Sequence, residues 1–299
     1  MKFIYGKQDL RSLERAQESC FLLTNGLGGY ASVSAAFSVS RCDQGLLVAA
    51  VKAPNVRISM VHRLSEKLKV GDEEVFLSTQ EFADNVPSED GWRHQSAFIY
   101  EYTPSWIYHV SGVQVTRRCA VAFEKNTSTV TYEIENRSGK ICSLNVTPFL
   151  KFAPKEQVLE EKKTFSMKGN AITSGAYTMY IHTSGDLKEI PVKWQTLSYS
   201  EDAKDGRPEK GMTFACCEIS VSVDPGETKV MEIIFSMDPK TESGAEILKA
   251  QNERLKKLVN KKTVMETGTG AAADLYGTHC AHLVWHAYQQ FGYDLDSDG

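Results

Sequence analysis

The densest cluster of glycines in the chain is the stretch TNGLGGYAS, residues 24–32. Glycine adopts positive φ at little cost, so such a cluster permits a tight turn or a close approach to the backbone. Gly26, Gly28 and Ala31 also match the loose dinucleotide-binding pattern. That pattern needs a strand–helix–strand unit with an acidic residue ending the second strand, whereas the next strand-like run, GLLVAAVK, ends in Lys52. We therefore expect no nucleotide here and no cofactor.

A second group of chemically competent residues lies near the C-terminus. His279, His282 and His286 fall within about 60° of one another on an α-helix, so they share one face. They are zinc-type ligands, but no acidic residue or cysteine completes the set, and Cys280 points elsewhere. The favoured interpretation is a polar helix face, with zinc as the alternative. The closing DLDSDG, residues 294–299, matches half of a calcium loop and lacks its distal glutamate, so no metal site is predicted.

Paired carboxylates are the groups that glycosidic hydrolysis requires, held at a fixed separation across the bond. The adjacent pairs Glu73–Glu74 and Glu160–Glu161 lie in polar segments and are predicted to be solvated. No Gly-x-Ser-x-Gly nucleophile elbow occurs. We assign no catalytic residue within this chain.

The elements that must position these residues are mainly strands. From about residue 20 to 238 the chain shows short, period-two runs such as TVTYEIEN, separated by turn signals such as NRSGK and DPGE. This pattern predicts an all-β fold, a large antiparallel β-sandwich over residues 1–240. The polar stretch SEDAKDGRPEKG is predicted to be a surface loop. Four aromatic residues on this part of the chain could include rings that stack on sugar, although aromatic residues on strands are more often buried in the core: Trp92, Trp106, Tyr108 and Trp194.

The pattern changes to helical near residue 240. Ser243 and Glu246 form a capping box, and an apolar stripe at helical spacing follows, which predicts a linker helix within 241–262. The segment 271–291 predicts a second helix that is apolar around most of its circumference, so it must be buried on several sides. We interpret 263–299 as the start of a truncated helical domain and the chain as a piece of something longer.

Charge and cysteine content restrict the classes of binding partner and the cellular compartment that we expect. A net charge of −4 over 299 residues, with scattered cations, predicts neither a nucleic acid nor a membrane as partner. The seven cysteines include no Cys-x-x-Cys pair and mostly lie in strand-like runs, which indicates buried free thiols. With no signal-peptide-like start, we expect a cytoplasmic protein.

Longer strings around the glycine cluster carry a family resemblance. FLLTNGLGGYAS, followed by RCDQGLLVAAVKAP and RLSEKLKVGDEEVFL, resembles the N-terminal domain of bacterial and archaeal glycogen debranching enzymes of the amylo-α-1,6-glucosidase type. The resemblance implies a β-sandwich, a linker helix and a following helical barrel that holds the catalytic carboxylates. It also implies an α-glucan substrate, no cofactor, and a barrel in the same polypeptide as partner. The chain alone is then expected to be inactive.

The same resemblance supplies the candidate site. Where the family usually reads Arg-Arg-Tyr-His-Gly, this chain has SRCDQG at 40–45, and the stretch TPFLKFAPKEQV lacks the Arg, Asp and His found there in the family. We expect the amide of Asn25 to hydrogen-bond a sugar hydroxyl and Tyr30 to stack on a pyranose ring. A purely structural turn is the alternative. The candidate substrate-binding residues are Asn25, Gly26, Gly28, Tyr30, Arg41 and Gln44. The alternative functions are a stand-alone carbohydrate-binding module or an interaction domain without sugar binding.

Overall fold

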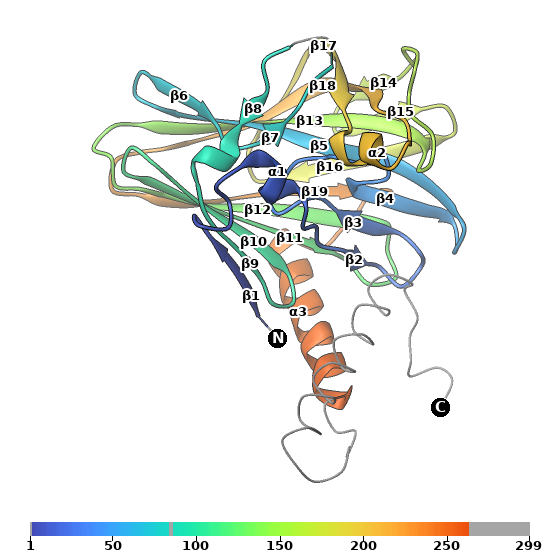
Figure 1. Cartoon of the computed structure of the whole chain (residues 1–299), viewed down its shortest axis with the longest axis horizontal. Helices are drawn as coiled ribbons and strands as arrows, with labels where there is room; N and C mark the ends of the chain where they lie inside the picture. Colours follow the sequence, from blue (N-terminus) through green and yellow to red (C-terminus); the bar gives the residue numbers. More distant parts are fainter. Residues whose placement is uncertain (1, 84–85, 263–299) are drawn as a thin grey trace.

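Two large antiparallel sheets pack face to face in the computed structural model, which describes residues 2–83 and 86–262 (Figure 1). The nine-stranded sheet runs in the order β1 (Phe3–Gly6), β9 (Gln95–Tyr100), β10 (Pro104–Val110), β11 (Val113–Val121), β12 (Thr127–Asn136), β19 (Thr228–Ser236), β16 (Tyr177–Thr183), β15 (Ala171–Ser174) and β14 (Ser166–Lys168). The predicted all-β sandwich is confirmed.

The eight-stranded sheet carries the glycine-rich segment at one edge. Its order is β17 (Asp186–Ser198), β18 (Lys210–Val223), β13 (Cys142–Pro154), β5 (Val56–Val70), β4 (Gly45–Lys52), β3 (Tyr30–Ser32) and β2 (Leu23–Thr24), with β6 (Glu73–Phe76) also paired to β5. The remaining elements are a small sheet of β7 (Thr79–Gln80) and β8 (Glu89–Asp90), the helices α1 (Leu13–Gln17), α2 (Ser200–Lys204) and α3 (Gly244–Lys262), and the 3₁₀ turn η1 (Gly91–Arg93).

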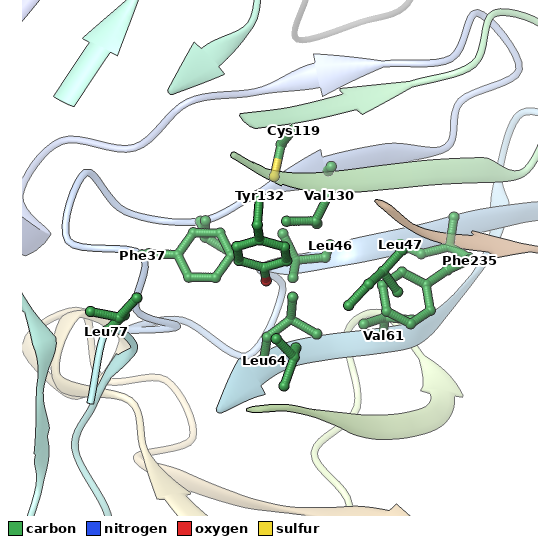
Figure 2. Packing of buried hydrophobic residues seen from close by; sticks show 14 of the residues in the cluster. Phe37, Leu46, Leu47, Val61, Leu64, Leu77, Cys119, Val130, Tyr132 and Phe235 are labelled. Carbon is green, nitrogen blue, oxygen red and sulfur yellow. The ribbon is translucent and has the colours of Figure 1, made fainter. Parts of the chain in front are cut away.

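The period-two runs become strands because one face of each enters the core. On β12, Val130, Tyr132 and Ile134 are at most 1% exposed. Inward side chains of both sheets meet in one cluster, which includes Phe235 of β19 and Val61 of β5 (Figure 2). The same alternation predicts both sheets, so the pattern identifies strands without saying which sheet each joins.

The turn at residues 224–226 shows this limit. The sequence predicts a turn at Asp224-Pro225-Gly226 with a strand on either side, and the turn forms with Gly226 at a φ of 81°. The flanking strands nevertheless belong to different sheets, because β18 pairs with β13 and β17 whereas β19 pairs with β12 and β16. The turn therefore crosses from one layer of the sandwich to the other.

A buried ion pair joins the two sheets. Glu66 of β5 and Arg117 of β11 are both fully buried, and the guanidinium donates from Nε to the carboxylate at 2.9 Å and from Nη2 at shorter range. The hydroxyl of Tyr132 donates to the same carboxylate at 2.5 Å, and Arg117 Nη1 donates to the hydroxyl of Tyr108 at 2.8 Å. The guanidinium carbon also lies 3.5 Å from the ring centroid of Phe37. We call this group the core ion pair.

Helix α3 begins at the predicted capping box. The hydroxyl of Ser243 accepts from the N–H of Glu246 at 3.3 Å, and the Glu246 carboxylate accepts from the N–H of Ser243 at 2.9 Å. The first two N–H groups of the helix donate to Glu232 of β19 at 2.9 and 2.8 Å, so a carboxylate from the sheet lies at the positive end of the helix dipole. The helix is thus fixed at its start to the nine-stranded sheet.

The apolar stripe of α3 packs on β11, β12 and β19. Its three buried apolar residues are Ile247, Leu248 and Leu255. The predicted helix within 241–262 is therefore confirmed, whereas the predicted second helix at 271–291 and the histidines His279, His282 and His286 lie outside the described residues. The division of the chain into domains stays a prediction.

The cysteines confirm the predicted free thiols, most of which are buried. Six cysteines fall within the described residues; all are free thiols, and five of them are buried, with Cys20 exposed. None of the helices in residues 2–83 and 86–262 has both the length and the apolar character needed to cross a membrane.

Candidate functional site

The glycine cluster forms the turn between β2 and β3, and Asn25 organises it. Its side-chain oxygen accepts from the N–H groups of Leu27 and Gly29, both at 2.9 Å. Its side-chain nitrogen donates to the carbonyl of Lys125 at 3.0 Å and to Asn126 Oδ1 at 3.2 Å. Asn25 is 3% exposed. The amide oxygen thus closes this turn on itself, and the amide nitrogen joins it to the β11–β12 turn.

The two glycines with positive φ are required by the chain's own neighbours. Gly26 has a φ of 79°, and a Cβ there would lie 2.5 Å from the ring of Phe123. Gly28 has a φ of 96°, and a Cβ there would lie 2.5 Å from the carbonyl oxygen of Pro54 in the β4–β5 hairpin. The close backbone approach inferred from the sequence therefore exists, and its partners are within the fold.

A groove of about 740 Å³ opens beside this turn. Alternate residues of the β2–β3 hairpin point into it, because successive side chains of a strand face opposite sides. We call it the hairpin groove, and its lining is Cys20, Leu22, Thr24, Gly26, Gly28, Tyr30, Ser32, Arg41, Asp43, Gln44, Pro54, Asn55, Arg57, Lys155 and Arg207. Its volume lies within the range of small-molecule sites, roughly 300–1,000 Å³.

Tyr30 stands in the groove with its hydroxyl held. That hydroxyl donates to the carbonyl of Asp43 at 2.5 Å, and the residue is half-buried. Burial, assisted by the Asp43 carboxylate, raises the pKa of the phenol, so it stays neutral. A ring fixed in this way presents a flat apolar surface to the groove.

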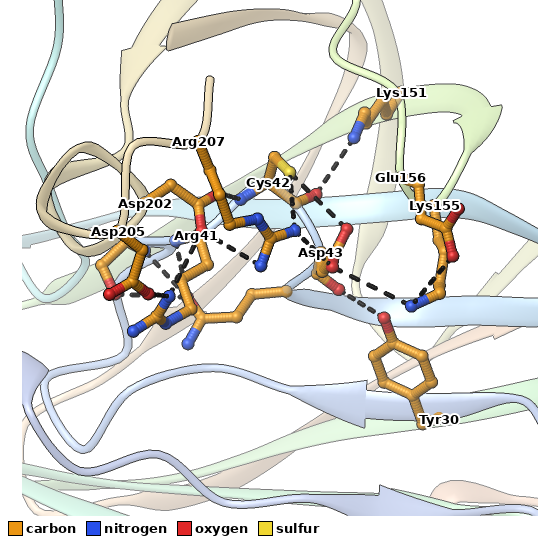
Figure 3. Close-up of polar contacts among 12 residues, drawn as sticks. Tyr30, Arg41, Cys42, Asp43, Lys151, Lys155, Glu156, Asp202, Asp205 and Arg207 are labelled. Atoms are coloured by element: carbon orange, nitrogen blue, oxygen red, sulfur yellow. Dashed lines mark hydrogen bonds and ion pairs between the residues drawn. The ribbon is translucent and has the colours of Figure 1, made fainter. Parts of the chain in front are cut away.

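Charged side chains form a network along one wall of the groove (Figure 3). Arg207 donates to Asp43 at 2.7 Å and pairs with Asp202 at 3.4 Å. Arg41 pairs with Asp205 at 2.5 Å and with Asp202 at 3.4 Å. Asp202 is fully buried, and its other oxygen accepts from the N–H of Cys42 at 2.7 Å. One buried carboxylate thus anchors both arginines.

Lys151 lies fully buried behind this wall. Its ammonium donates to the carbonyl of Cys42 at 3.0 Å, and burial lowers the pKa of Lys151 to about 8. His62, buried next to it, has its pKa lowered by burial and by the lysine charge, and its Nε2 lies 2.9 Å from the hydroxyl of Tyr199. These groups support the loop that carries Cys42 and Asp43.

One polar atom in the groove lacks a partner. Thr24 is 5% exposed, lines the groove and lies opposite Tyr30 in the β2–β3 pair. Its hydroxyl oxygen has no hydrogen-bond partner among the residues that the structure describes. A buried hydroxyl without a partner costs free energy, so the site offers a hydrogen bond that a ligand can make.

The structure brings five of the six sequence-predicted site residues together. Gly26, Gly28, Tyr30, Arg41 and Gln44 line the groove, and Asn25 lies next to them in the turn. Gln44 is held inside the fold, because its side-chain oxygen accepts from the N–H of Ser40 at 2.8 Å. Their roles toward a substrate stay predictions.

Sequence reasoning missed the other half of the site. Asp202 and Arg207 belong to the stretch predicted to be a surface loop, which is corrected here: it contains α2, and Asp202 is completely buried. Asp43 and Lys155 lie in the two segments that depart from the family pattern, and that departure was the available signal. Thr24 lies within the glycine-rich string and carried no signal of its own.

Other candidate residues lie away from the groove. Trp106 and Tyr108 are fully buried, so the core interpretation of these two rings is confirmed. The pairs Glu73–Glu74 and Glu160–Glu161 are exposed, as predicted. Within the described part of the chain, no cluster of three His, Cys, Asp or Glu side chains is arranged to hold a metal ion.

A family model described as glycogen debranching enzyme N terminal matches residues 20–230. The chain belongs to this family. The match contains the glycine turn, every residue that lines the hairpin groove and most strands of both sheets. A search of curated proteins gave no significant match.

Three solved structures match the chain at TM-scores below 0.4 and at identities of 10–12%. A candidate kojibiose phosphorylase from the human microbiome aligns with a TM-score of 0.37 and 10% identity over 96% of this chain and 38% of that one. A bacterial glucoamylase complexed with acarbose aligns with a TM-score of 0.36 and 10% identity, over 88% of this chain and 37% of that one. A candidate aldose 1-epimerase from Escherichia coli K12 aligns with a TM-score of 0.37 and 12% identity, over 73% of this chain and 98% of that one. The chain therefore spans less than two thirds of the first two proteins.

Proposed function

We propose that this chain is the non-catalytic N-terminal domain of a glucan-active enzyme and that the hairpin groove contacts the α-glucan. The family match supports the first part, because its members are described as N-terminal domains of debranching enzymes. In the finer form of the proposal, the parent enzyme hydrolyses α-1,6 branches of a glycogen-like glucan in the cytoplasm. The chemistry then belongs to a catalytic barrel in the same polypeptide.

The observation that carries the glucan contact is the pairing of Thr24 with Tyr30 in the groove. Sugars present hydroxyls at their edges and C–H groups on their faces, so they need a hydrogen-bonding atom beside an apolar surface. Thr24 supplies a buried, unsatisfied hydroxyl and Tyr30 a half-buried ring whose own hydroxyl is held by Asp43. The charged wall adds donors and acceptors along the same groove.

The proposed organisation follows the sequence boundaries. Residues 1–240 form the sandwich domain, residues 241–262 the linker helix, and residues 263–299 begin the helical catalytic domain. The fixed start of α3 on the nine-stranded sheet supports this division, because it sets the direction in which the chain leaves the sandwich.

The test of the glucan contact is Thr24→Val in the full 299-residue chain, measured by calorimetric titration with maltoheptaose. The substitution keeps the shape and removes the hydroxyl, so we expect binding to weaken about tenfold while the fold stays as stable as before. Thr213→Val is the matched control, because Thr213 Oγ1 is also buried without a partner in the described structure but lies outside the groove. Equal affinity of both variants would overturn the glucan contact.

A structural role of the turn is the second candidate, because the Asn25 amide and both positive-φ glycines face other parts of the fold. Tyr30→Ala and Tyr30→Phe separate the two functions. If the ring stacks on sugar, the alanine variant loses maltoheptaose binding whereas the phenylalanine variant keeps it. If the residue serves only the fold, neither variant has a binding defect beyond its loss of stability.

A further inference from the structure

A second cavity, which we call the α3 cavity, lies on the other side of Phe123 from the glycine turn. It has a volume of about 430 Å³, is open to solvent on one side and lies between α3 and the turn that joins β11 to β12. Gly26 packs against one side of the Phe123 ring, and the guanidinium of Arg254 lies 3.7 Å from its centroid. The cavity is therefore separate from the hairpin groove, and the two share no lining residue.

Gln251 is the unusual residue of the α3 cavity. It lies on α3, lines the cavity and is 2% exposed. Neither its side-chain nitrogen nor its side-chain oxygen has a hydrogen-bond partner within residues 2–83 and 86–262. A primary amide buried in this way leaves a donor and an acceptor unpaired side by side, which is unfavourable unless something else fills them.

Four charged residues also line the cavity, two cations and two anions: Lys125, Arg254, Glu242 and Glu246. Lys125 forms an ion pair with Glu242 at the rim, and the carboxylate of Glu246 accepts from Ser243 in the capping box. The rest of the lining is apolar, formed by residues such as Ile247 and Phe123, and the guanidinium of Arg254 lies over the Phe123 ring. Because the two cations and the two anions balance, the lining suits a neutral ligand that has apolar faces and offers one donor and one acceptor on adjacent atoms.

We propose that the α3 cavity is a second binding site, which takes a single neutral pyranose through its vicinal hydroxyls. One hydroxyl of such a pair donates to the Gln251 oxygen and its neighbour accepts from the Gln251 nitrogen. The C–H face of the ring lies against the apolar wall. The site goes beyond the hairpin groove, since it rests on different residues and does not require the groove to bind glucan.

The test uses the full chain with isotopically labelled isoleucine methyl groups and D-glucose as probe. The methyl group of Ile247 forms part of the cavity wall and reports this site rather than the groove. We expect its resonance to shift in a saturable way with glucose in the wild type. Tetrahydropyran-2-methanol, which keeps the ring but has no vicinal hydroxyls, should bind at least about tenfold more weakly. Absence of a shift with glucose, or equal binding of both compounds, overturns the proposal.

Gln251→Met provides the second arm, since methionine has a similar length and no polar side-chain N or O. We expect this variant to lose the Ile247 response to glucose and to melt at the same temperature as the wild type or higher. Glu253→Gln, at an exposed position on the same helix, is the control variant. It should leave the Ile247 response to glucose and the melting temperature unchanged. A Gln251→Met variant that binds glucose like the wild type, or that melts markedly lower, contradicts the proposal. The lower melting temperature would mean that the amide has partners in the free protein.

Discussion

Two clusters in this molecule pair arginine with a buried carboxylate, but they differ in how far the arginines are exposed. In the core ion pair, Glu66 and Arg117 are fully buried, and two tyrosine hydroxyls complete their hydrogen bonds. In the wall of the hairpin groove, Asp202 is equally buried, but the arginines that it anchors are 34% and 39% exposed. The first cluster is closed on every side, whereas the second is closed behind and open in front.

We propose that this difference separates polar groups that stabilise the fold from polar groups that bind a ligand. The groups of a closed cluster have no hydrogen-bonding capacity left for a ligand. Substituting them therefore changes only the free energy of unfolding. An open cluster costs little to build on its exposed side and keeps donors and acceptors for a ligand. The comparison predicts that substitutions in the core ion pair change unfolding and that substitutions in the groove wall change binding.

The largest effect is expected from Arg117→Met. The variant leaves the Glu66 carboxylate buried without its cation, and burial already raises the pKa of that carboxyl. The loss should be about 3–5 kcal/mol of unfolding free energy, measured by urea denaturation. Arg118→Met is the neighbouring control, because its pair with Glu133 is 41% and 37% exposed and should contribute no more than about 1 kcal/mol. Similar losses in both variants would remove the distinction between closed and open pairs.

A pH-dependent effect is expected from Lys151→Met. Because burial lowers the pKa of Lys151 from 10.5 to about 8, the unfolded chain binds more protons than the folded one between these two values. The wild type should therefore gain about 3 kcal/mol of stability relative to the variant as the pH rises from 8 to 10.5. Urea unfolding of both proteins across this range measures the gain. Parallel pH profiles would show that the lysine is not desolvated.

The smallest change in stability is expected from Asp43→Asn in the groove wall. Its pair with Arg207 is 24% and 39% exposed, so unfolding should change by about 1 kcal/mol or less. Binding of maltoheptaose should fall by about tenfold, because a charged acceptor beside Tyr30 is lost. An unfolding change comparable to that of Arg117→Met, with unchanged binding, would place Asp43 in the structural class.

Local patterns predicted the elements of this molecule better than their assembly. The alternation in β12 and the capping box at Ser243 and Glu246 identify a strand and a helix start, since both depend on neighbours within a few residues. The crossing of the turn at 224–226 between sheets has no local signature. It depends on which distant strands pair, and sequence alternation is the same for both sheets.

The candidate site was predictable only on the side that carries the motif. The glycine-rich string led to Tyr30, whereas Asp202 was missed because a polar, turn-rich stretch normally lies in solvent. Its carboxylate is buried because Cys42, 160 positions earlier, donates a backbone N–H to it. Lys151 was missed for a different reason, because lysine is almost never fully buried. Long-range partners that satisfy a charge cannot be read from the residue that carries it.

Helix α3 is held at its start by two sets of hydrogen bonds, so a small change of angle there moves its far end over a large distance. Its 19 residues extend about 28 Å at 1.5 Å per residue, and both the capping box and Glu232 fix the end at the sheet. A tilt of about 10° at that joint would displace the far end by about 5 Å, calculated from the same length. The hydrogen bonds of Glu232 therefore set the direction in which α3 runs toward Lys262, so a substitution on β19 is expected to move the end of the helix that lies farthest from that strand.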